Sequence, residues 1–84
     1  MKKTAYFDVE NYADNGNRVV SKRETRDIAI ALSFCKETPN SSVMVCNQKG
    51  SVLGTAYFSS KHPPSLEAIR KKVKKLKSVS LVKE

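Results

Sequence analysis

The sequence predicts a small α+β fold, in which one antiparallel sheet carries two helices on one face in the order ββαββα. Residues 4–12 alternate between apolar and polar side chains, as a half-buried strand does. The pair Asn15-Gly16 is the strongest short hairpin signal, and residues 66–77 repeat apolar side chains at helical spacing. A chain of 84 residues has room for one thin core, so we expect a single domain over 1–84.

The first strand is predicted from its alternation. Ala5, Phe7 and Val9 would point to one side and the polar residues between them to the other. After the Asn-Gly turn, residues 18–20 can return as a second strand, because Asn and Gly both tolerate the positive φ angles of a tight hairpin. The first unit of the chain is therefore a predicted hairpin.

A helix is predicted to follow from Ser21. Ser21 and Glu24 match the capping-box pattern, in which each side chain accepts a hydrogen bond from the backbone N–H of the other. The body, residues 28–35, places on one face Ile28, Ala31, Leu32 and Cys35. Ile30 and Phe34 project elsewhere, so this helix is too apolar for a wide wet face. We expect it to lie wedged between the sheet and the C-terminal helix, or to be partly covered by a second subunit.

A second hairpin is predicted from residues 43–46 and 52–58. Gly50 can supply the left-handed residue of the turn between them. Gly54, inside the second strand, indicates a bulge or a close backbone approach, and the helix face of the sheet is the expected neighbour.

The last helix starts after Ser65, a natural N-cap. At about 100° per residue, one arc of it holds the apolar side chains Leu66, Ile69, Val73 and Leu76. The rest of its circumference carries the cations Arg70, Lys71, Lys72, Lys74, Lys75 and Lys77. The helix should therefore lie on the core and present a positive surface to water.

A second topology remains open. If residues 78–82 form a last strand and residues 18–20 become loop, the order changes to βαββαβ, the ferredoxin-like split unit. In both topologies, two helices cover one face of an antiparallel sheet.

The positive charge is concentrated near the C-terminus. The net charge is +8, of which residues 1–60 contribute +2 and residues 61–84 contribute +6. Such an asymmetry favours a polyanionic partner. The longest unbroken apolar run is residues 28–32, so we expect no membrane span and no signal peptide.

No motif predicts catalysis, a metal site or a cofactor. His62 has no acid or nucleophile at a fixed local spacing, and Asp8 and Glu10 alternate as on the solvated face of a strand. Cys35 and Cys46 lack zinc-ligand spacing and are predicted to be buried reduced thiols of a cytoplasmic protein. We therefore expect a non-enzyme.

The function that these patterns favour is non-catalytic binding of DNA or RNA. The contacts to phosphate would come from Arg70, Lys71, Lys72, Lys74, Lys75 and Lys77. Tyr6, Tyr12 and Tyr57 could offer stacking platforms for single strands, and three other arginines could supplement Arg70 if the fold brings them close, namely Arg18, Arg23 and Arg26. The alternative is an accessory or inhibitory module that binds an acidic face of a protein partner. Monomer and homodimer both remain open.

Overall fold

The computed structural model describes residues 3–13, 18–76 and 79–80. In chain order, the elements are β1 (Lys3–Thr4), β2 (Tyr6–Tyr12), β3 (Val19–Thr25), α1 (Ile28–Cys35), β4 (Asn40–Cys46), β5 (Val52–Phe58), α2 (Leu66–Lys74) and β6 (Val79–Ser80). The predicted α+β class and the order ββαββα are both confirmed.

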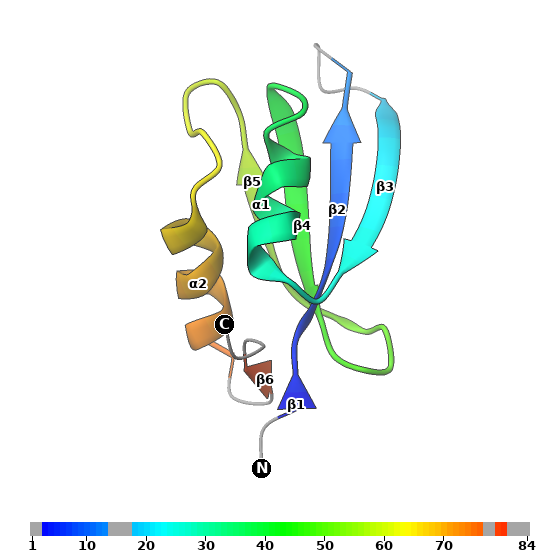
Figure 1. Ribbon diagram of the computed structural model, residues 1–84, viewed down its shortest axis with the longest axis vertical. Helices are drawn as coiled ribbons and strands as arrows, with labels where there is room; N and C mark the ends of the chain where they lie inside the picture. Colours follow the sequence, from blue (N-terminus) through cyan, green and yellow to red (C-terminus); the bar gives the residue numbers. More distant parts are fainter. Residues whose placement is uncertain (1–2, 14–17, 77–78, 81–84) are drawn as a thin grey trace.

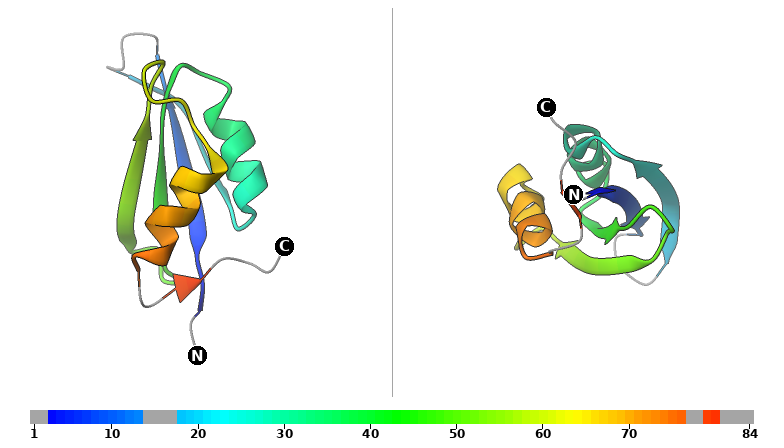
Figure 2. Two further views of the ribbon diagram at one scale, coloured as in Figure 1. Left: turned by 90° about the vertical axis from the view of Figure 1, so that its left-hand side faces the viewer. Right: turned by 90° about the horizontal axis from the view of Figure 1, so that it is seen from below.

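The main sheet has four antiparallel strands in the order β3-β2-β4-β5, and both helices lie on one face of it (Figure 1). Its inner strands, β2 and β4, are the first strands of the two hairpins, and they pair around Val9 and Val43. The chain therefore consists of two hairpin–helix halves with an approximate two-fold relation, joined along β2 and β4. The sheet curves around the two helices (Figure 2).

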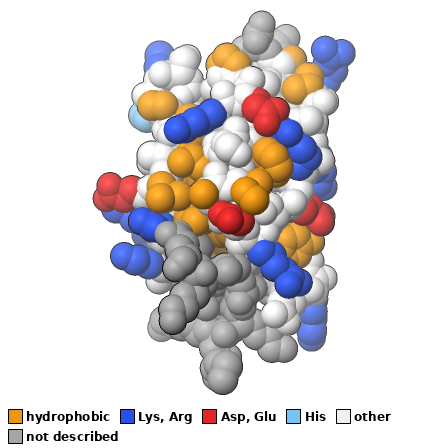
Figure 3. Space-filling view, in the orientation of Figure 1, with side chains coloured by type: hydrophobic (Ala, Val, Ile, Leu, Met, Phe, Trp, Pro, Cys, Tyr) orange, Lys and Arg blue, Asp and Glu red, His pale blue; other side chains and the backbone are white. Residues whose placement is uncertain are grey.

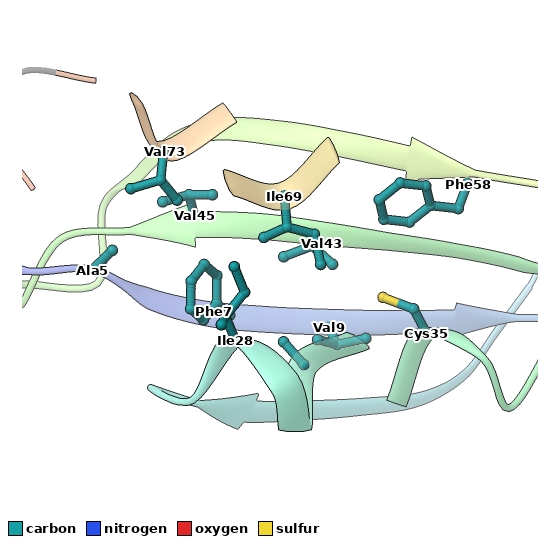
Figure 4. Close-up of a cluster of buried hydrophobic side chains, with 11 residues drawn as sticks. Ala5, Phe7, Val9, Ile28, Cys35, Val43, Val45, Phe58, Ile69 and Val73 are labelled. Atoms are coloured by element: carbon teal, nitrogen blue, oxygen red, sulfur yellow. The ribbon is translucent and has the colours of Figure 1, made fainter. Parts of the chain in front are cut away.

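The core lies between the sheet and the helices (Figure 4). As the alternation predicts, Phe7 and Val9 are fully buried on the helix face of β2, and Ala5, directly before β2, is fully buried too. The other buried side chains of this core cluster come from the four elements α1, β4, β5 and α2: Ile28, Ala31, Cys35, Val43, Val45, Phe58, Ile69 and Val73. Both helices thus hold the sheet through short apolar stripes.

The predicted start of the first helix at Ser21 is wrong. Residues 19–25 form β3, which pairs with β2 along its whole length, and the helix begins at Ile28. Its N-cap is Asp27, whose Oδ1 accepts hydrogen bonds from the backbone N–H groups of Ala29 at 2.8 Å and Ile30 at 3.3 Å. Ser and Asp are both good N-caps, and the pairing of β3 with β2 decides between them.

Helix α1 lies beside α2 and not between the sheet and α2, so the first of the two positions expected for it is not the one observed (Figures 1 and 2). Partial cover by a second subunit stays a prediction. Helix α1 packs over β2, β3 and β4, whereas α2 packs over β5 and β4. Ile28, Ala31 and Cys35 are buried as expected, but Ile30 remains 44% exposed. Hydrophobic side chains gather in the middle of this face, with charged side chains around them (Figure 3).

The ferredoxin-like alternative is not the arrangement observed. Strand β3 occupies one edge of the main sheet, and Val79–Ser80 pair in parallel with β1 in a separate two-residue ladder. The remaining residues of that predicted last strand, 78, 81 and 82, lie outside the described residues. Within the part of the chain that the structure describes, no helix is long and apolar enough to cross a membrane.

Both glycine predictions for the second hairpin are confirmed. Gly50 has a φ of 88° in the turn, a left-handed conformation that a side chain disfavours. Gly54 lies beneath α2, because a Cβ built on it would be 3.4 Å from Lys72 Cδ and 3.9 Å from Leu76 Cδ1. A register shift between Val45 and Cys46 interrupts the ladder beside it. Helix α2 thus approaches the backbone of β5 closely.

Candidate nucleic-acid interface

Helix α2 is fixed at its start and along its apolar stripe. Ser65 Oγ accepts a hydrogen bond from the backbone N–H of Ala68 at 3.1 Å, and Glu67 lies in the first turn, where the helix dipole favours an anion. Ile69 and Val73 are buried against the sheet, and Leu66 and Leu76 are half-buried beside them. A helix held in this way keeps its cations in defined directions.

The six predicted phosphate contacts do not form one uniform surface. Lys71, Lys74 and Lys75 are exposed, Arg70 and Lys72 are half-buried, and Lys77 lies outside the described residues. Lys71 Nζ lies 3.6 Å from Glu67 Oε1, an exposed pair one turn apart. Helical spacing directs the side chains of Arg70 and Lys74 to the flank opposite that of Lys72 and Lys75.

Three of these cations line a groove between α2 and the edge strand β5, and Figure 2, left, faces this side of the molecule. The groove has a volume of about 650 Å³. Its lining comes from β5, the loop after it and α2: Thr55, Ala56, Tyr57, Phe58, His62, Pro63, Ala68, Lys71, Lys72 and Lys75. None of these lining residues is acidic, so the groove has a positive potential.

Two features of the groove escaped sequence reasoning. Ala56, which lines the groove, follows Gly54 by two residues on the helix face of β5, and the two pair with Val43 and Val45. His62 comes to the groove in a tight turn, in which its backbone N–H and C=O both bond to Ser59, at 3.1 and 3.0 Å. The alternation of small residues on a strand was the available signal, whereas nothing local indicates the position of His62.

The open face of the sheet has the opposite character. Strand alternation directs toward it the carboxylates of Asp8, Glu10 and Glu24 and the ammonium group of Lys22, whose Nζ lies 3.4 Å from Asp8 Oδ2. The pKa of Tyr6 is raised, chiefly by the neighbouring Glu24 carboxylate. This face would repel phosphate groups.

The tyrosines therefore differ in their suitability for stacking. The Tyr12 hydroxyl bonds to Ser42 Oγ at 2.8 Å and donates to Glu10 Oε1 at 3.0 Å, and burial raises the pKa of Tyr12. Tyr57, at the edge of the sheet, is 72% exposed. Of the three tyrosines, only Tyr57 combines a free ring surface with a position next to the lysines.

The arginines near β3 do not reach α2. Arg23 projects over the ring of Phe34, with its guanidinium carbon 4.1 Å from the ring centre, and its Nη2 lies 2.8 Å from Glu37 Oε1. Strand β3 forms one edge of the sheet, and α2 covers the other. The fold therefore does not meet the condition under which Arg18, Arg23 and Arg26 could supplement Arg70.

The sequence matches no protein-family model, and no curated protein or solved structure is significantly similar to the chain. The physical character of the groove therefore carries the functional argument alone.

Proposed function

We propose that this protein binds nucleic acid without catalysing a reaction on it, through the lysines of α2 that line the groove beside β5. The observation that carries the proposal is the convergence of Lys71, Lys72 and Lys75 on a groove without an acidic lining residue. Lysines that neutralise phosphates release condensed counterions, and this release drives binding with little dependence on base sequence.

The distribution of charge over the domain supports the same reading. The carboxylates of Asp8, Glu10 and Glu24 lie on the opposite face of the sheet, so a polyanion that approaches the molecule is attracted toward α2 and repelled from the open face. The domain would thus meet nucleic acid in one preferred orientation. The proposal includes a cytoplasmic location, because Cys35 and Cys46 are free buried thiols.

The test is the salt dependence of binding in a charge-reduced variant. In Lys71→Gln/Lys75→Gln, two groove cations are lost, so we expect weaker binding and a log–log salt slope that is shallower by about 1.4 to 1.8. Fluorescence anisotropy with labelled single-stranded DNA, duplex DNA and RNA at several salt concentrations measures both quantities. The fold should persist, because both side chains are exposed.

The matched control is Lys36→Gln/Lys49→Gln. These two lysines are also exposed, but they lie at the end of α1 and in the β4–β5 turn, and their removal lowers the net charge by the same amount. The control should retain nearly native affinity and slope. Equal losses in the two double variants would show that only net charge matters, and the groove assignment would then be wrong.

An acidic protein partner is the second candidate, and one observation favours it. Strand β5 is an outer strand of the main sheet, with its outer backbone edge along the groove, so an extended acidic segment could pair with it beneath the lysines. Backbone pairing resists salt better than phosphate contacts do. Binding that survives high salt would favour this candidate.

A further inference from the structure

The two edge strands of the sheet, β3 and β5, occupy equivalent positions but carry side chains of different size toward the helices. On the β3 flank, the residue that pairs with Val9 is Arg23, and its side chain covers Phe34 and reaches Glu37 of the segment after α1. On the β5 flank, the residue that pairs with Val43 is Ala56. Val9 and Val43 are partners at the centre of the sheet, so Arg23 and Ala56 occupy equivalent positions.

This difference explains why one flank is open. The next position toward the turn is Ser21 on the first flank and Gly54 on the second, and each again pairs with a helix-facing residue of the inner strand, Asn11 or Val45. Side chains fill the space beside α1, whereas beside α2 the methyl group of Ala56 lines a groove of about 650 Å³. Gly54 instead lets Lys72 and Leu76 of α2 approach the backbone of β5. The small residues of β5 therefore set both the opening and the position of the helix beside it.

We infer that this groove binds single-stranded nucleic acid in preference to duplex, an inference that rests on the proposed function above. Lys71 and Lys75 are one helical turn apart, which separates them by about 6 Å along the axis. This separation is comparable with the spacing of successive phosphates in an extended strand. Lys72, whose stem lies against Gly54, adds a third cation on the strand-facing side.

Tyr57 supplies the contact that distinguishes a single strand. It pairs with Ser42, so its ring lies at the rim of the groove, on the side of β5 that faces away from the helices. With 72% of the residue exposed, the ring is available to an unpaired base whose phosphates lie on the lysines. Bases inside a duplex are stacked on one another and cannot use it.

The shape of the flank also disfavours a duplex. The major groove of B-DNA, about 12 Å wide, admits one helix or a two-stranded ribbon. Here α2 and β5 lie side by side, and the stem of Lys72 lies against Gly54 of β5, whereas Lys71 and Lys75 are exposed. A single strand can enter the groove and reach Lys72 as well as the two exposed lysines, whereas a duplex would reach only the lysines on the outer side of α2.

The test compares the native protein with Tyr57→Ala and Tyr57→Phe. Anisotropy is measured with a labelled single strand, with the duplex of the same sequence, and with poly-glutamate as an acidic peptide chain. We expect the native protein to prefer the single strand. Tyr57→Ala should lower single-strand affinity about 5- to 150-fold and leave the duplex nearly unchanged, because stacking on an aromatic ring is lost. Tyr57→Phe should bind as the native protein does.

The outcomes separate this inference from the proposed function. If Tyr57→Ala binds the single strand as tightly as the native protein, but Lys71→Gln/Lys75→Gln weakens binding, nucleic-acid binding stands and the single-strand preference is overturned. Tighter binding of poly-glutamate than of either nucleic acid would overturn both in favour of a peptide partner. Absence of nucleic-acid binding at low salt would also overturn both.

Discussion

The Asn11 side chain is buried and makes four hydrogen bonds, and replacing it with Ala should destabilise the domain strongly. The side chain lies on the helix face of β2 and is 1% exposed. Its Nδ2 donates to the backbone carbonyl of Phe34 at 2.8 Å and to Thr38 Oγ1 at 3.0 Å. Its Oδ1 accepts from Ser21 Oγ at 2.9 Å and from Arg23 Nη2 at 3.2 Å. One amide thus joins β2, β3, the end of α1 and the segment before β4.

The loss of unfolding free energy in Asn11→Ala depends on which hydrogen bonds the partners of Asn11 retain. At about 1 kcal/mol per hydrogen bond, four bonds set an upper value of about 4 kcal/mol for Asn11→Ala. Phe34 O still accepts from the Glu37 N–H, the Thr38 hydroxyl still donates to Asn40 O, and Arg23 still pairs with Glu37. We therefore expect a loss of about 2 to 3 kcal/mol, a large part of the roughly 4 to 13 kcal/mol typical of such a domain.

Urea denaturation measures this loss. The midpoint should fall by about 2 to 3 M for a slope near 1 kcal/mol/M. Ser21→Ala removes one of the four bonds and should cost about 1 kcal/mol alone, but little in the Asn11→Ala background, because its partner is already gone. Additive losses in the double variant, or equal losses in the two single variants, would refute this account of Asn11.

The remaining predictions concern Glu67, which lies beside the groove lysine Lys71, and the buried thiol of Cys35. Glu67→Gln removes the carboxylate 3.6 Å from Lys71 Nζ, so single-strand affinity at low salt should rise about twofold. The melting temperature should fall slightly, because the first turn of α2 loses its anion. Unchanged or weaker binding in anisotropy would contradict this. Burial raises the pKa of the Cys35 thiol. The unfolded chain therefore loses this proton first, and the stabilisation, fully present below about pH 8.5, is lost as the pH rises further. Urea titrations between pH 8 and pH 10 should show a shallower pH dependence for Cys35→Ala than for the native protein, and identical pH slopes would rule out the thiol as a contributor.

The sequence predicted elements wherever one period dominated. Alternation identified the buried face of β2, and the helical spacing of Ile69 and Val73 identified the buried face of α2. Gly50 and Gly54 were interpreted correctly because each has a local backbone reason. The prediction of where α1 starts was wrong because Ser21 and Arg23 of β3 donate hydrogen bonds to Asn11 of the neighbouring strand β2. A partner in another strand cannot be identified from the local sequence.

The candidate site was predicted in composition and not in geometry. The cations of α2 were visible as a set, but their division into groove lysines and an opposite flank depends on where β5 lies. The alternation of the first strand also indicated that Tyr6 and Tyr12 lie on the same face. Their neighbours Asp8, Glu10 and Glu24 make that part of the face unsuitable for phosphates. Tyr57 lies on the same face, but on the edge strand β5 that borders the groove, and it is 72% exposed. Distances across a sheet cannot be obtained from local periodicity.

The seam between β2 and β4 has a consequence for how the chain acquires its structure. The first hairpin and α1 are complete at Cys35, but the inner edge of β2 has no partner strand until β4 follows. Phe7 and Val9 belong to the same core cluster as Val43 and Val45 of β4. Without the other half, each half thus exposes apolar side chains and an unpaired strand edge. We expect the two halves to gain their order together, as one cooperative transition, and the nascent first half to be the stage most prone to association with other chains.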